Sequence, residues 1–179
     1  MKKYELTEET VTVYGKTLYR IRAVRDFGSV KTGEFGGYIE KEENLSHFGN
    51  AWVSGNAWVF DNARVYDDTW VYGNARVYDN AWVFGNAKVY GDAWVSGNAE
   101  VFNTRHFFVQ GPIGSRNGFI TFYRTKDNTV EVRCGCFSGS LQKFVDRVEE
   151  THGGSRYEKE YKLAAELAKV CIRLEGESR

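Results

Sequence analysis

The chain has little proline, little cysteine and no excess of either charge in its 179 residues. The 24 basic and 24 acidic side chains cancel, so net charge gives no argument for binding nucleic acid or a membrane surface. No apolar run is long enough to cross a bilayer or to form the core of a signal peptide. The composition therefore predicts a cytoplasmic protein without a membrane partner, for which nucleic acid is not the expected ligand.

The three cysteines are too few to suggest a disulfide framework or a metal site. An odd number cannot pair completely, and Cys134 and Cys136, one residue apart, lack the spacing and further ligands of a zinc site. We expect reduced cysteines, no metal and no cofactor. One proline, 19 glycines, 5 Trp, 11 Tyr and 12 Phe instead favour flat β surfaces separated by glycine turns.

A repeat of six residues fills positions 50–103 without insertion or deletion. Each unit has alanine or threonine at its second position and valine at its fourth, as in NAWVSG and NARVYD. Residues two apart on a strand share a face, so both point inward and the residue between them points outward. The Gly/Asp and Asn/Asp residues that follow tolerate the left-handed conformation of a tight turn. Strands broken this often predict a solenoid.

The repeated pattern V-x-[GD]-[ND]-A-x resembles the hexapeptide repeat of left-handed parallel β-helices, in which three units form one triangular coil of eighteen residues. Nine units then predict three turns. Left-handedness follows from the resemblance and not from the period, so a right-handed helix stays open as an alternative. The strict period of six disfavours a solenoid of five-residue repeats.

The resemblance extends from Asp26 to about Asn103. The text Asp-Phe-Gly from position 26, followed by Gly36-Gly37, Asn44-Leu-Ser and Asn50-Ala-Trp-Val, is similar to bacterial and phage hexapeptide-repeat, transferase-like proteins of unestablished activity. Proteins with this repeat are commonly trimers. The resemblance therefore implies a homotrimer and makes coenzyme A-dependent acyl transfer a candidate activity.

Outward residues eighteen apart should stack in columns along the solenoid. These columns are rich in aromatic residues, and for most of them a self-supporting ladder is the structural interpretation. Exposed apolar patches also mark interfaces. As the oligomer interface we expect four tryptophans, namely Trp52, Trp58, Trp70 and Trp94.

The flanking segments divide the chain into an N-terminal β-hairpin cap (1–43), the β-helix (44–103) and a small α+β domain (104–179). In the last part we expect strands near 107–109, 119–123 and 129–134, and helices opened by Ser138 or Ser140 and by Ser155. The second helix should turn Tyr161, Leu167 and Cys171 toward the core. The expected fold class is mainly β, a left-handed parallel β-helix with these two additions.

The glycine-rich segment 111–118 is the main candidate for a ligand site. Backbone amides and guanidinium groups together suit a phosphate or a nucleotide. The residues expected to bind it are Ser115, Arg116, Asn117, Arg124 and Arg133. An ordinary hairpin loop with solvated arginines is the structural alternative, because a lone glycine-rich loop is a weak signal.

Three functions remain open from the sequence. The favoured hypothesis is a non-enzymatic homo-oligomeric protein that binds a small anionic, nucleotide-like ligand; in a phage version it would sequester a host signalling nucleotide in the host cytoplasm. An acyltransferase would need a histidine base, for which His106 is the candidate, because His47 fits an inward core position. A scaffold for a protein partner is the third hypothesis. Nucleophilic chemistry by Cys134 or Cys136 with His152 is discounted.

Overall fold

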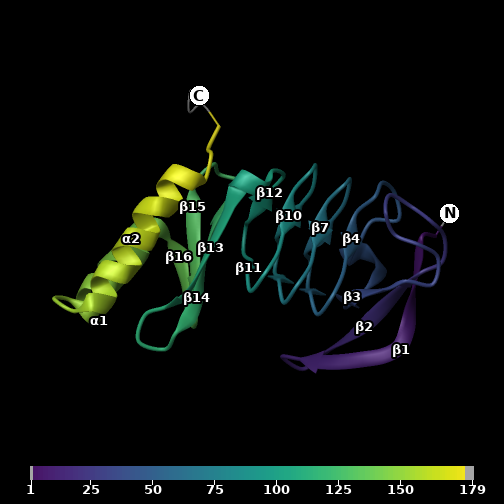
Figure 1. Cartoon of the computed structure of the whole chain (residues 1–179), viewed down its shortest axis with the longest axis horizontal. Helices are drawn as coiled ribbons and strands as arrows, with labels where there is room; N and C mark the ends of the chain where they lie inside the picture. Colours follow the sequence, from purple (N-terminus) through teal and green to yellow (C-terminus); the bar gives the residue numbers. More distant parts are fainter. Residues whose placement is uncertain (1, 176–179) are drawn as a thin grey trace.

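The computed structural model describes residues 2–175 and places three parts along one long axis (Figure 1). The N-terminal part contains β1 (Tyr4–Val13), β2 (Lys16–Ala23) and β3 (Phe35–Ile39). The middle part is the solenoid, and the C-terminal part is a sheet covered by two helices. The predicted fold class, mainly β with a solenoid, an N-terminal β cap and a C-terminal α+β part, is confirmed.

The solenoid consists of three parallel ladders of two-residue strands. One ladder joins β4 (Trp52–Val53), β7 (Trp70–Val71) and β10 (Lys88–Val89); the next joins β6 (Arg64–Val65), β9 (Trp82–Val83) and β12 (Glu100–Val101); the third joins β3, β5 (Trp58–Val59), β8 (Arg76–Val77) and β11 (Trp94–Val95). Repeat positions eighteen apart pair throughout, which confirms the predicted columns. The inward valines and alanines are buried and form the core.

The solenoid has about four turns and not the three that were expected. The additional turn is formed by residues before the regular repeat: Ile39 pairs with Val59, and Leu45 forms a bridge with Val65. A strand pair in the solenoid needs only an inward apolar residue and free backbone groups, so it can form without the six-residue repeat sequence. The fully buried Asn44 links this turn to the next by donating to the Ala63 carbonyl at 2.9 Å.

The chain itself covers the open end of the solenoid. Trp52 is fully buried there, and its ring contacts the rings of Tyr4 and Phe27 edge-on. The buried Lys3 ammonium donates to the Ala51 carbonyl at 2.7 Å. The expectation that Trp52 forms an oligomer interface is therefore wrong, because this side chain presents no surface to a second copy.

The hairpin β1–β2 also covers part of one outer wall. Val13 and Leu18 are buried against Phe60, and the Tyr14 ring lies near the Phe60 ring. The Phe60 ring stacks in turn on Tyr78. The protein's own N-terminal strands therefore cover part of this aromatic wall.

A four-stranded sheet seals the other end, in the order β13 (Phe107–Ile113), β14 (Gly118–Arg124), β15 (Val130–Cys134), β16 (Phe137–Ser140). Successive side chains of strand β14 point to opposite faces of this sheet. Thr121 accepts a hydrogen bond from the Trp94 amide at 2.9 Å, and Tyr123 joins the solenoid core. Ile120 and Phe122 point to the opposite face, where the helices pack. The sheet is therefore a layer between the last coil and the helices.

Helices α1 (Leu141–His152) and α2 (Arg156–Cys171) begin at the predicted caps, Ser140 and Ser155. The core-facing residues of α2 are the alanines at 164, 165 and 168, whereas Leu167 is 47% exposed. The expectation for Leu167 is wrong, because it lies on another face of a 3.6-residue helix from these alanines. A short 3-10 turn at Glu42–Asn44 lies within the first turn of the solenoid, and a second at Thr104–His106 follows its last strand. Neither helix, nor any other in residues 2–175, is long and apolar enough to span a bilayer.

Candidate functional site

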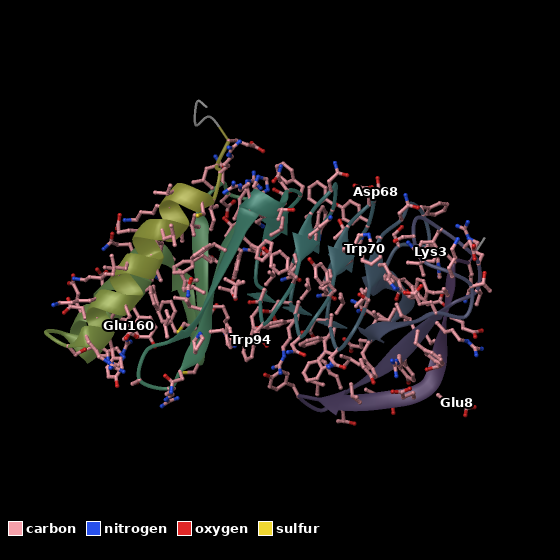
Figure 2. The ribbon with its side chains drawn as sticks, in the orientation of Figure 1. Lys3, Glu8, Asp68, Trp70, Trp94 and Glu160 are labelled. Carbon is pink, nitrogen blue, oxygen red and sulfur yellow. The ribbon has the colours of Figure 1, made fainter. Side chains whose placement is uncertain are left out.

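A cavity of about 640 Å³ lies where the solenoid, the sheet and both helices meet. The solenoid contributes Asn74, Arg76, Asp92 and Trp94, and the C-terminal part contributes the other described lining residues. Figure 2 shows Trp94 at the end of the solenoid that faces the sheet, far from Lys3 at the opposite end. The C-terminal lining residues include Ser115, Arg116, Phe119, Arg133, Cys134, Cys136, Phe137, Arg147, His152 and Tyr161.

An aromatic–cation stack forms the solenoid side of this cavity. The Arg76 guanidinium lies 4.3 Å from the ring centroid of Trp58 and 4.6 Å from that of Trp94. The three residues occupy successive rungs of one column, so the eighteen-residue repeat puts them together. Such contacts stabilise by about 0.5–2 kcal/mol each and restrict the arginine to one position.

Arg133 approaches the same wall from strand β15. Its guanidinium lies 5.7 Å from the Trp94 centroid and 5.9 Å from the Tyr78 centroid. The Nε atom of Arg133 is buried without a hydrogen-bond partner in residues 2–175.

The loop between β13 and β14 supplies Ser115 and Arg116, two of the residues expected to bind a ligand, to the lining of the cavity. Gly114 and Asn117 have φ angles of +71° and +47°, which reverse the chain at this point. The Gly114 amide donates to the Glu160 carboxylate at 2.7 Å, and a side chain at Gly114 would collide with Tyr161. The loop is thus fixed against α2. Asn117 is exposed and does not line the cavity.

Arg124 does not belong to this site. Its side chain is buried, and it forms ion pairs with Glu100 at 2.7 Å and with Glu175 at 3.0 Å. It also stacks on the Phe102 ring. The prediction that Arg124 binds a ligand is wrong, because its charge is already neutralised where the sheet meets the last coil.

Several lining residues were not predicted from the sequence, among them Arg76, Asp92 and Arg147. The Trp-Arg-Trp column was visible in the repeat and placed Arg76 between two indoles. The repeat does not indicate which wall meets the C-terminal part, so it could not identify Arg76 as a site residue. Trp94, which was expected at an oligomer interface, lines the cavity. Trp94, Trp58 and Trp70 are all half-buried.

The two histidines considered first lie away from the cavity. His106 is buried, its Nδ1 accepts from the Phe102 amide at 3.4 Å, and its ring packs edge-on against Phe102. Burial, aided by the nearby Arg124, lowers the pKa of His106 to about 4. His47 stacks on Tyr4 at the open end of the solenoid.

Cys134, Cys136 and His152 all line the cavity, although nucleophilic chemistry by these residues was discounted from the sequence. Cys134 is half-buried, and burial raises the pKa of its thiol. Cys136 is exposed. No group of three or more potential metal ligands occurs in the part of the chain that the structure describes.

The comparison with known proteins supports the repeat and no activity. A family model described as the YdcK β-solenoid repeat matches residues 57–73 and 71–85, within the solenoid. No curated protein matches the chain significantly. The match supports a β-solenoid protein, and the relationship to hexapeptide-repeat transferases is not confirmed.

Proposed function

We propose that the protein is a non-enzymatic binding protein that holds a small anionic, nucleotide-like ligand in the cavity between the solenoid and the C-terminal sheet. The observation that carries this proposal is the lining: Arg76, Arg116, Arg133 and Arg147 surround the cavity, with Asp92 as the single acidic residue among the described lining residues. Arginine binds phosphate and carboxylate groups through paired N–H donors, so this set suits an anion.

The rest of the lining suits an organic anion better than an inorganic one. Phe119, Phe137 and Tyr161 place aromatic rings at the cavity, and a flat base can pack against such surfaces. A volume of about 640 Å³ falls in the range of sites that enclose a small molecule. Ser115 adds a hydroxyl that can donate to a phosphate oxygen.

The position of the candidate base supports the proposal of binding over acyl transfer. His106 is buried, engaged with the Phe102 amide and outside the cavity lining, so no observation favours acyl transfer. Self-association, including the homotrimer, belongs to the proposal as well. Large apolar side chains that are exposed on the solenoid walls include Tyr72, Trp82 and Tyr90, and these rings are available for contact with a second copy.

Sequestration of a host signalling nucleotide by a phage-encoded form is the concrete biological version of this proposal. It rests on the resemblance of residues 26–103 to phage hexapeptide-repeat proteins and on the arginine residues that line the cavity.

Calorimetry with a panel of nucleotides tests the proposal. The wild type should bind at least one nucleotide, and Arg116→Ala and Arg133→Gln should each weaken binding about tenfold or more, because each removes a charge-assisted hydrogen bond of about 1.5–3 kcal/mol. Arg64→Gln is the control for the loss of one arginine: Arg64 lies on another wall of the solenoid and does not line the cavity, so this variant should bind as the wild type does. Absence of binding to every nucleotide would refute the proposal.

A further inference from the structure

The positive charges of the cavity are largely without counter-ions. Arg76, Arg116 and Arg133 form no ion pair with any residue between 2 and 175, and Arg147 has only a long contact of 3.5 Å to the exposed Glu150. Like charges gathered in one cavity repel each other, and a ligand with several negative charges relieves this repulsion more than a monoanion.

Two of these guanidinium groups are also held in place before any ligand arrives. Arg76 and Arg133 both lie beside the Trp94 indole, at 4.6 and 5.7 Å from its centroid. Contact with an aromatic ring does not use the N–H donors of a guanidinium; the Nε of Arg133 is buried, so the terminal nitrogens of Arg133 are its donors toward the cavity. One ligand can therefore reach both guanidinium groups, as neighbouring phosphates of a single chain would.

Asp92 places a negative charge in the same cavity. The Asn74 side chain donates to Asp92 Oδ1 at 3.0 Å, which orients the carboxylate at the corner of the solenoid. A carboxylate only accepts hydrogen bonds, and in an anion site it opposes binding unless the ligand brings donors. The N–H groups of a base or the hydroxyls of a ribose are such donors.

We infer that the ligand is a nucleoside di- or triphosphate, whose phosphates bind Arg76, Arg116 and Arg133 while donors of its base or sugar bind Asp92. This inference rests on the proposed function and narrows its ligand class. It excludes nucleosides and inorganic phosphates as preferred ligands and ranks nucleoside monophosphates below the longer phosphate chains.

The test is a calorimetric series on the full chain, with a nucleoside, its mono-, di- and triphosphate, and inorganic pyrophosphate. The affinity should rise about tenfold or more from mono- to diphosphate, since the added phosphate gains at least one charge-assisted hydrogen bond. Asp92→Asn should weaken the nucleoside diphosphate about tenfold and leave pyrophosphate binding unchanged or tighter. A change in folding would move both ligands in the same direction.

The chain offers a matched control for this variant. Asparagine is the usual residue at this repeat position, so Asp92→Asn fits the solenoid. Asp68 forms the same corner contact, accepting from the Asn50 side chain at 2.8 Å, but does not line the cavity. Asp68→Asn should therefore bind every ligand as the wild type does.

The outcomes separate the inference from the proposed function. If mono- and diphosphates bind within about threefold of each other, or if Asp92→Asn weakens pyrophosphate as much as the nucleotide, the inference fails and the binding function stands. If no nucleotide binds, both fail. A rise with phosphate number together with selective loss in Asp92→Asn supports the inference.

Discussion

Thr69 provides the sharpest test of the solenoid core. It occupies the second position of its repeat, where the other eight units have alanine, and it is fully buried. Its Oγ1 atom has no hydrogen-bond partner in the part of the chain that the structure describes. A buried hydroxyl without a partner costs about 1–3 kcal/mol, so this residue should destabilise the fold relative to an apolar residue of the same shape.

Thr69→Val exchanges the hydroxyl for a methyl group and keeps the shape of the side chain. We expect the free energy of unfolding to rise by about 1–2 kcal/mol, which corresponds to an increase in Tm of about 2–8 °C for a chain of this size. Thr69→Ala should gain less, because it also removes a methyl group from the core. Urea denaturation followed by circular dichroism measures the difference.

The control is the reverse exchange in the same repeat. Val71 is also fully buried, and Val71→Thr introduces a hydroxyl of the kind that Thr69→Val removes. It should lower the free energy of unfolding by about 1–3 kcal/mol. If Thr69→Val lowers the stability as well, the Thr69 hydroxyl has a favourable partner, such as a buried water, and the reasoning about this core is refuted.

Two further predictions concern single groups. Burial lowers the pKa of His106 to about 4, so between about pH 6.5 and 4 the unfolded chain binds more protons than the folded one, and stability should fall as the pH drops through this range. The urea midpoints at pH 7 and pH 5 should therefore differ more for the wild type than for His106→Gln. Equal differences in the two proteins would contradict this prediction. Cys136 is exposed at the cavity, whereas Cys134 is half-buried and its thiol pKa is raised, so iodoacetamide should modify Cys136 first. A bound nucleotide should slow the modification of Cys136, and mass spectrometry measures the labelling of both cysteines. Preferential labelling of Cys134 would count against the described cavity.

The regular part of the fold could be predicted from the sequence because its information is local. The period of six assigns Val77 and Ala75 to the core, and the eighteen-residue column places Arg76 between Trp58 and Trp94. The first turn was predicted only in part: the β-helix was expected from residue 44, which includes Leu45, but Ile39 was assigned to the cap because it lies outside the repeated sequence. The helix caps at Ser140 and Ser155 were likewise local signals and were predicted correctly.

The candidate site was only partly predictable, since it depends on how the C-terminal sheet docks on the last coil. Arg116, Arg124 and Arg133 looked alike in the sequence, as cations on neighbouring strands and loops. They differ in the structure because side chains alternate between the two faces along β14 and β15 and because the sheet docks on the last coil. Arg124 forms ion pairs with Glu100 and Glu175, whereas Arg133 lies beside the rings of Tyr78 and Trp94. No local pattern specifies which of two arginines finds a carboxylate.

That difference supports a binding role for the cavity. A buried arginine is stabilised when carboxylates neutralise it, as they do for Arg124, and the protein therefore has the means to neutralise cations at this boundary. Arg76 and Arg133 are placed instead against aromatic rings, which hold a guanidinium group without cancelling its charge. A site of this kind keeps its electrostatic attraction for an anion from solution. If Arg76→Gln raised the stability of the chain and left nucleotide binding unchanged, this interpretation of the stack would be wrong.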